Sequence, residues 1–459
     1  MKIAVVALGK MGLPVAAWYA SRGHDVTGCD INPALVAAVN RGECPLPYEP
    51  GLADMLRAAV AAGRLRATRD TVAGVGEADA VLVLVPLGVD ARHQPDYGPL
   101  DTAFAAVGRG LRPGALVVLE TTVAVGDTRR RFLPILLAAR PGGRRDFHLA
   151  FSPERVQAGS VFRDLCAYPR IVGGIDAESG RRAAAFYAEN FGVEVRLLSS
   201  SEAAEFCKLA ESVYRDVNIA LANELALYAE TCGVDVREVF PAANSQPQSH
   251  LHHPGVGVGG HCIPVYPYLL IQRTPFSELA ALARRINDAM PAHAVAVLER
   301  HLGGLAGRRV LILGVSFRAG VREAAHSPAL TLARELAARG ARPLAHDPLF
   351  APEELRALGL EPAALAPPPA VDAVVLQTAE PLYRTLDFRG FPGLRVVLDG
   401  RGALDPQVVA AAGVRYLAIG RGERVDTGAA AGDGASSSPA PLLEAGEPEM
   451  RAGLREGSR

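Results

Sequence analysis

The chain has 459 residues, of which 49% are hydrophobic and 21% charged, a composition typical of a soluble globular protein with two or three domains. Its formal net charge of −1 argues against a nucleic-acid-binding surface, which needs a basic surplus. Six cysteines without CxxC spacing argue against a zinc ribbon or a disulfide framework and favour a reducing, cytoplasmic setting. No apolar run is long enough to span a bilayer.

Residues 1–195 alternate short apolar runs with alanine-rich amphipathic stretches. This alternation predicts an α/β fold with a doubly wound, parallel Rossmann-type sheet. The N-terminus also has features of a signal peptide, but Gly9, Gly12 and Pro14 interrupt its apolar run, and a strand–turn–helix explains every position. The runs typical of buried strands are residues 2–8, 25–31, 79–86, 115–122 and 147–153.

The turn after the first strand reads A-x-G-x-x-G, with Ala7 where a dinucleotide-binding fingerprint usually begins with glycine. Gly9 would let a pyrophosphate come close, and Gly12 would let the helix pack on the sheet. Asp30 ends the second strand, where an acid binds ribose hydroxyls and disfavours the phosphate of NADP. The segment therefore predicts NAD binding rather than packing alone. We expect alanine to be tolerated in place of the first glycine because Ala7 would keep ordinary backbone angles.

The middle of the chain is helical. A capping box of Ser199 and Glu202 predicts the start of one long helix, and Gly233 predicts its end. A second helical stretch covers 276–302. Residues 196–300 are therefore expected to form a central helical domain.

An α/β pattern returns near residue 308. Four further apolar runs and a helix near 328–338 predict a second, smaller Rossmann-like domain over 301–422. Residues 423–459 are small, polar and interrupted by Pro and Gly, and we expect them to be a disordered tail. The apolar runs are 308–317, 341–348, 370–379 and 394–402.

Lys208 stands out because the chain uses arginine for almost every positive charge. Of its 48 basic residues, only Lys2, Lys10 and Lys208 are lysines. A lysine in mid-chain therefore suggests a role that arginine cannot fill, such as proton transfer near neutral pH. The alternative is an ordinary surface lysine whose stem covers apolar neighbours.

Cys262 follows four glycines in "PGVGVGGHCIPVY" (254–266). Glycines let the backbone approach a ligand closely, so a thiol on this loop suits a nucleophile whose pKa a nearby cation such as Lys208 would lower. A buried structural thiol is a second interpretation. A metal site is a third and is disfavoured, because a glycine-rich loop lacks the fixed spacing of zinc ligands. The metal-site interpretation is suggested by four nearby histidines, His250, His252, His253 and His261.

These features together resemble the nucleotide-sugar 6-dehydrogenases over residues 1 to about 420. The segments "KLAESVYRDVNIALANELA" (208–226) and "GVGGHCIP" (257–264) carry the resemblance, and "GGHCIP" is more similar to the N-acetylhexosamine branch than to the UDP-glucose branch. The resemblance implies a homodimeric, cytoplasmic enzyme that binds no membrane. It would oxidise a UDP-sugar to the uronic acid, use two NAD per turnover and serve polysaccharide biosynthesis.

The resemblance also implies roles for individual residues. Cys262 would be the nucleophile that forms a thiohemiacetal and then a thioester, Lys208 would stabilise oxyanions, Thr122 would hold water and Glu154 would be the base for hydrolysis. For Thr122 a hydroxyl that satisfies a turn, and for Glu154 a solvated loop carboxylate, remain alternatives. The cofactor would contact Gly9, Lys10, Met11, Gly12, Asp30, Pro86 and Thr122. The sugar nucleotide would contact Arg155, Ser212, Gly255, Gly257, Gly259, Gly260, Phe317, Arg318 and Arg401.

Several positions depart from the family pattern. Tyr266 stands where the family has an aspartate that assists proton transfer, and Ser212 replaces an asparagine. Gln248 and Ala325 replace arginines that contact the substrate and NAD, whereas Arg318 replaces a lysine and keeps its charge. These changes are compatible with an unusual sugar substrate or with lost activity. Two rivals therefore stay open: a single-step NAD-dependent hydroxyacid dehydrogenase, which needs no Cys262, and a non-catalytic nucleotide-sugar or NAD sensor.

Overall fold

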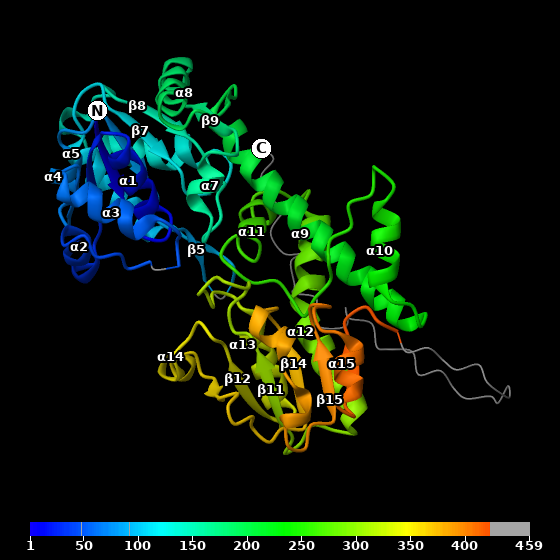
Figure 1. The fold of residues 1–459 in the computed structure, drawn as a ribbon. Helices are drawn as coiled ribbons and strands as arrows, with labels where there is room; N and C mark the ends of the chain where they lie inside the picture. The colour runs from blue at the N-terminus through cyan, green and yellow to red at the C-terminus, as the bar shows by residue number, and fades with distance from the viewer. Residues whose placement is uncertain (47, 91, 423–459) are drawn as a thin grey trace.

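The computed structural model describes residues 1–46, 48–90 and 92–422. Two α/β domains are joined by two long helices, α9 (Ser201–Thr231) and α12 (Glu278–Leu302), which lie side by side between them (Figure 1). The tail predicted at 423–459 lies outside the described residues. Within the described part of the chain, no helix combines the length and apolarity needed to cross a bilayer.

The N-terminal sheet confirms all five predicted strands and adds three. Its strand order is β10-β9-β8-β7-β4-β1-β2-β3. The sheet is parallel as predicted, except that β9 pairs antiparallel to β8. The connection between them contains only the five-residue α7 (Val161–Leu165), which supplies no long crossover helix. The strands are β1 (Lys2–Val6), β2 (Asp25–Cys29), β3 (Leu65–Thr68), β4 (Ala80–Val83), β7 (Leu116–Leu119), β8 (His148–Phe151), β9 (Arg170–Gly174) and β10 (Val195–Leu197).

Both faces of this sheet are covered. Along β1, Ile3 and Val5 join one hydrophobic cluster, while Ala4 and Val6 join the other. That alternation gives the continuous apolar runs that predicted buried strands. The covering helices are α1 (Gly12–Ser21), α2 (Pro33–Asn40), α3 (Leu52–Ala61), α4 (Thr71–Val75), α5 (Gly98–Gly110), α6 (Leu133–Ala139) and α8 (Ala177–Phe191), and a small hairpin joins β5 (Gly88–Val89) to β6 (Pro95–Asp96).

Helix α9 confirms the long helix expected after residue 199. Its N-cap is Ser200, which accepts a hydrogen bond from the Ala203 backbone N–H, so the predicted capping box on Ser199 was wrong. The Glu202 carboxylate pairs with Arg129 of the N-terminal domain instead. The central region also contains α10 (Val236–Asn244) and α11 (Tyr266–Ile271), and the loop between these two helices carries Cys262.

The C-terminal sheet is wholly parallel, with the order β13-β12-β11-β14-β15-β16. In both sheets the direction of the strand order reverses beside the first strand, between β1 and β4 and between β11 and β14. Open α/β sheets bind ligands at such a point. The predicted helix near 328–338 is α13 (Pro328–Ala338), and α14 (Pro352–Ala357) and α15 (Pro406–Ala411) follow it. The strands are β11 (Arg309–Leu313), β12 (Arg342–His346), β13 (Glu361–Pro362), β14 (Ala373–Leu376), β15 (Val396–Asp399) and β16 (Arg415–Ala418).

Candidate functional site

The turn between β1 and α1 has the shape of a dinucleotide site. A Cβ added to Gly9 would meet nothing within 4 Å, so the turn is open toward solvent where a pyrophosphate would approach. A Cβ on Gly12 would lie 1.8 Å from the Ala7 carbonyl oxygen, so this position requires glycine. Ala7 itself has φ +74°, and the expectation of ordinary backbone angles there was wrong. The first position of the fingerprint keeps its left-handed geometry even where the glycine is lost, at a cost in strain.

Asp30 is fixed beside this turn. Its Oδ2 accepts a hydrogen bond from the Leu8 N–H at 2.7 Å, and its Oδ1 accepts one from the Asn32 N–H at 2.9 Å. A carboxylate held in this way at the end of β2 fits the ribose of a dinucleotide. The side chain of Lys10, in the same turn, pairs with Glu323 of the C-terminal domain.

The remaining predicted cofactor contacts lie near the same end of the sheet. Met11 is the N-cap of α1. Pro86 follows β4 in an exposed loop, and the buried Thr122 follows β7. The carboxyl ends of these parallel strands share one edge of the sheet. That edge offers the three features that the fingerprint needs to bind NAD: an open turn, a fixed acid and a helix N-terminus.

The glycine-rich loop is held at three points. The Gly255 N–H donates to the Asn223 Oδ1 of α9 at 2.9 Å, the Gly260 N–H donates to the Ala325 carbonyl at 2.8 Å, and the Tyr266 N–H donates to the Cys262 carbonyl at 2.8 Å. The loop therefore spans from α9 to the C-terminal domain and ends at the start of α11. Cys262 is solvent-exposed at its tip.

Phe317 packs directly on the glycines of this loop. A Cβ on Gly259 would lie 2.6 Å from the Phe317 Cβ, and one on Gly260 would lie 3.1 Å from the ring. Gly257 and Gly260 also have positive φ values, of +135° and +93°. The glycines are thus needed for the loop conformation and for its contact with the C-terminal domain.

Lys208 points into the protein rather than away from it. Its Nζ donates to the Glu154 carbonyl of the N-terminal domain at 2.7 Å. The Ser212 hydroxyl, one turn later on α9, donates to the Lys208 carbonyl at 3.1 Å. The amine is therefore placed where α9 meets the loop after β8.

Tyr266 connects the cysteine loop with the N-terminal domain. Burial raises the pKa of Tyr266, the Cys262 thiol and the Glu154 carboxylate raise it further, and a hydrogen bond with Thr122 opposes them. These interactions bring the Tyr266 hydroxyl next to the side chains of Thr122 and Cys262. Because Lys208 contacts Glu154, the four residues expected to act in catalysis lie around one centre, although they come from three parts of the chain.

Sequence reasoning missed two buried charges beside Glu154. Glu120 follows β7 and is 1% exposed, and Arg170 opens β9 and is 4% exposed. The Tyr187 hydroxyl donates to Glu120 Oε1 at 2.6 Å, and an Arg170 nitrogen lies 3.4 Å from the same oxygen. Burial raises the pKa of Glu120 to about 7. The sequence feature that could have indicated Glu120 is its position directly after the apolar run "LVVL", because a buried carboxylate needs partners.

One half-buried cation lies on the C-terminal side of the loop. Arg401 Nε donates to the Gln377 carbonyl at 2.6 Å, and its Nη1 would lie 2.9 Å from a Cβ on Gly255. Burial lowers the pKa of Arg401 to about 10, against partial compensation by Asp399. A guanidinium that faces a glycine loop is suited to a diphosphate.

Two further arginines lie near this region. Arg318 Nη2 donates to the Ala158 carbonyl at 2.7 Å, and burial followed by the charge of Arg215 lowers the pKa of Arg318. Arg215, on α9, was missed by sequence reasoning, which singled out Lys208 and Ser212 in its segment. Arg155 pairs with Glu211 of α9 at 2.6 Å, and its contact with the substrate stays a prediction.

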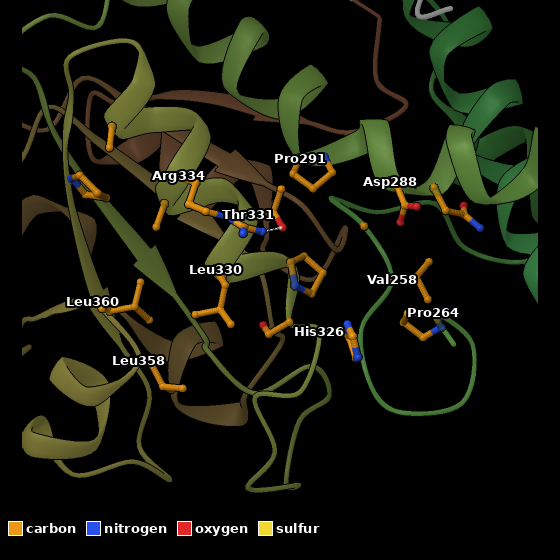
Figure 2. A pocket seen from close by; sticks show the side chains of 18 of the residues that line it. Val258, Pro264, Asp288, Pro291, His326, Leu330, Thr331, Arg334, Leu358 and Leu360 are labelled. Carbon is orange, nitrogen blue, oxygen red and sulfur yellow. Dashed lines mark hydrogen bonds between the residues drawn. The ribbon is translucent and has the colours of Figure 1, made fainter. Parts of the chain in front are cut away.

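A cavity of about 680 Å³ lies between the glycine-rich loop, α12 and α13 (Figure 2). Val258 and Pro264 of the loop, Asp288 of α12 and Thr331 of α13 point toward it, and His326 lies at the side near the loop. Cys262 and Lys208 do not line this cavity.

Comparisons with known proteins cover almost the whole described chain. Family models match residues 1–191 as the NAD binding domain, 202–289 as the central domain and 311–406 as the UDP binding domain of the UDP-glucose/GDP-mannose dehydrogenase family. The UDP-N-acetyl-D-mannosamine dehydrogenase of Pyrococcus horikoshii is 33% identical over 92% of this chain and 100% of its own length. The NDP-N-acetyl-D-galactosaminuronic acid dehydrogenase of Ralstonia nicotianae is 36% identical over 89% of this chain and 97% of its own.

Solved structures show the same similarity in three dimensions. The structure of a UDP-glucose dehydrogenase from Pyrobaculum islandicum superimposes with a TM-score of 0.82 and 30% identity, covering 91% of this chain and 97% of that one. The P. horikoshii UDP-N-acetyl-D-mannosamine dehydrogenase structure gives a TM-score of 0.81 and 31% identity, covering 92% and 100%.

Proposed function

Because the chain belongs to the UDP-glucose/GDP-mannose dehydrogenase family and is an NAD-dependent oxidoreductase, we propose that it oxidises a UDP-N-acetylhexosamine at C6 to the uronic acid. The motif "GGHCIP" and the activities named for the most similar relatives favour UDP-N-acetylmannosamine among such sugars. UDP-N-acetylglucosamine and UDP-glucose are the other members of the proposed substrate class.

The proposed reaction begins with the C6 alcohol. NAD, when bound, accepts one hydride in each of the two oxidation steps. Lys208 stabilises the alkoxide that forms as the alcohol loses its proton, because its ammonium is held on the Glu154 carbonyl, beside the proposed base. The cations Arg318 and Arg401 hold the diphosphate and so fix the sugar in the cleft.

The aldehyde is then captured by Cys262. The thiolate sulfur adds to C6, which gives a thiohemiacetal whose oxyanion Lys208 stabilises, and loss of the second hydride leaves a thioester. Water positioned by Thr122 attacks the thioester carbonyl while Glu154 takes a proton from it. The carbon–sulfur bond breaks, the acid leaves and the Cys262 thiolate is restored. Tyr266 offers a neutral hydroxyl to the same centre in place of the family's aspartate.

One observation supports this mechanism above the others: Cys262, Thr122, Glu154 and Lys208 lie around one centre, with the Tyr266 hydroxyl next to Thr122 and Cys262. A single-step dehydrogenase has no use for an exposed thiol at that position.

The test is a panel of UDP, GDP and CMP sugars incubated with NAD and followed by absorbance at 340 nm. The proposal expects two NADH per uronic acid, no acid from Cys262→Ser, and a thioester on Cys262 detected by intact mass in Glu154→Gln. One NADH per product with an active Cys262→Ser variant would establish the single-step rival. Thermal stabilisation by a sugar nucleotide without any NADH would establish a sensor.

We propose that the protein is a homodimer built on α9. Exposed apolar side chains recur along this helix, including Phe206 at 53%, Tyr214 at 57%, Leu221 at 42% and Tyr228 at 68% exposure. Their spacing places them on one stripe, and such a stripe is typical of an interface between helices. We also propose a cytoplasmic location, which the six unpaired cysteines support.

A further inference from the structure

Two carboxylates approach one buried guanidinium behind the catalytic cluster. Arg170 lies 3.4 Å from Glu120 Oε1 and 3.9 Å from Glu154 Oε2. The Glu154 backbone N–H also donates to the Glu120 carbonyl at 3.1 Å, which ties the loop after β8 to the end of β7. Glu120 therefore shares one guanidinium with Glu154, the residue proposed as the base for hydrolysis.

The shared guanidinium is held in place. The Arg170 side chain is 5% exposed, and its guanidinium carbon lies 4.5 Å from the centroid of the Tyr187 ring and 5.1 Å from that of Phe191. Tyr187 also donates its hydroxyl to Glu120. A planar cation packed against two neighbouring rings presents its nitrogens in fixed directions, so the position of each carboxylate depends on that of the other.

The charges of this cluster do not balance when both carboxyls are ionised. Two negative charges then face one positive charge, and a single proton makes the cluster neutral. One oxygen each of Glu120 and Glu154 is buried without a hydrogen-bond partner among the described residues. Burial raises the pKa of Glu120 to about 7, and the nearby Glu154 charge raises it while Arg170 lowers it.

The tyrosines around the pair add no negative charge, while the Lys208 ammonium adds one positive charge near Glu154. Burial raises the pKa of Tyr19 and Tyr187 well above the ordinary range, so both phenols stay neutral. Tyr266, facing Glu154 from α11, is neutral for the same reason. Lys208 donates to the Glu154 carbonyl, and Arg155 donates its backbone N–H to Glu154 Oε1 at 2.6 Å.

We propose that Glu120 is a positioning residue that, through the Arg170 guanidinium it shares with Glu154, keeps the Glu154 carboxylate oriented and strengthens it as a base. This inference rests on the proposed function of Glu154. In the hydrolysis of the thioester, a bond forms between the water oxygen and the thioester carbon, and one proton passes from the water to Glu154. The carbon–sulfur bond breaks, and its electron pair returns to the Cys262 sulfur. The negative charge of Glu120 favours that proton transfer because it disfavours a second unprotonated carboxylate beside one cation.

The test follows the decay of the Cys262 thioester by quenched intact mass between pH 5 and 9, with UDP-N-acetylmannosamine and NAD. In the parent chain we expect the decay rate to rise as the pH passes through about 7, where Glu120 ionises, because its negative charge then strengthens the base. In Glu120→Gln this rise should be absent, and the rate at pH 8.5 should be about tenfold lower, because a weaker base accepts the proton less readily.

Two variants separate charge from structure. Glu120→Asp keeps the charge and should keep the rise of the decay rate near neutral pH. Glu49→Gln is the matched control: Glu49 is 4% exposed and accepts the N–H groups of Gly159 and Val161, both at 2.7 Å, in the loop that follows Glu154. It touches the same loop without facing Arg170, so this variant should keep the rise. A rise that persists in Glu120→Gln, or that is also lost in Glu49→Gln, would overturn the inference.

A second measurement needs no turnover. The double-mutant cycle of Glu120→Gln and Glu154→Gln, read by urea unfolding, should give a coupling free energy that differs between pH 5.5 and pH 8.5, since the two charges coexist only at the higher pH. A coupling of zero at both pH values overturns the inference even if the enzyme is active. If the sugar panel yields no NADH, the proposed function fails. A pH-dependent coupling in that case still shows that Glu120 and Glu154 are linked electrostatically.

Discussion

Replacing Glu205 with glutamine tests which of two opposing effects governs a buried carboxylate on α9. Glu205 is fully buried and accepts hydrogen bonds from the backbone N–H groups of Gly126 and Thr128. Such donors favour the ionised carboxylate, whereas burial favours the neutral acid. Burial is the larger effect, and the pKa of Glu205 rises from 4.5 to about 7.

The sign and size of the stability effect follow from that shift. A carboxyl with a raised pKa binds its proton more tightly in the folded chain, so its contribution is complete below pH 4.5 and is lost as the pH rises through 7. Between pH 5 and pH 8.5 the loss amounts to roughly 2.5 kcal/mol of the free energy of unfolding. Glutamine carries no charge at any pH, so Glu205→Gln removes this dependence. The variant should therefore gain about 2.5 kcal/mol relative to the parent chain over that interval.

Urea unfolding at pH 5, 7 and 8.5 measures the difference. The control is Glu202→Gln, one turn earlier on the same helix, because Arg129 holds the pKa of Glu202 down to about 2. Glu202 is ionised throughout the interval, and its stability contribution is lost only as the pH falls below about 4.5, so the control difference should be flat. A flat Glu205→Gln difference, or one of opposite sign, would show that the two N–H donors outweigh burial and would refute the reasoning.

Three further variants test the cofactor turn and the dimer. Ala7→Gly should stabilise the chain by about 1 kcal/mol in thermal unfolding, because Ala7 has φ +74° and glycine adopts that angle without strain; no gain would contradict the strain. Gly12→Ala should abolish measurable NAD binding by calorimetry, since its Cβ would lie 1.8 Å from the Ala7 carbonyl oxygen; retained affinity would contradict the site. Leu221→Glu should convert the proposed dimer to a monomer in analytical ultracentrifugation, while an exposed charge swap such as Glu238→Lys should not; an unchanged dimer would move the interface away from the stripe on α9.

Much of the fold could be predicted because its strands are buried on both faces. The runs "KIAVV" and "LVVL" are apolar at every or nearly every position, and β4 is buried throughout. The edge strands were missed for the opposite reason: β3 reads "LRAT" and β10 reads "VRL", with exposed residues that give no apolar run. The antiparallel direction of β9 depends on the shape of the preceding connection, which periodicity does not report.

The candidate site was predictable where a residue type is unusual for its position. A lysine in an arginine-rich chain and a cysteine among glycines both stood out. Glu120 and Arg170 did not, because neither residue type is unusual, and only the fold brings β7 and β9 together around Glu154. The strain at Ala7 could not be predicted for a related reason. The fingerprint gives the residue types that bind NAD, whereas the φ angle of Ala7 is set by the folded turn.

The arrangement around Lys208 explains why this position is not arginine. Lys2 pairs with Glu77 and Lys10 with Glu323, whereas in the described part of the chain no carboxylate lies within ion-pair distance of Lys208 Nζ. Its hydrogen-bond partner is the neutral Glu154 carbonyl, so the positive charge stays available to the oxyanions of the proposed reaction. An arginine would carry the same charge but could not release a proton to the alcohol oxygen or take one from it. Lysine can do both, because its ammonium releases a proton and its neutral amine takes one, and in the proposed reaction the alcohol must lose its proton before the thiol acts.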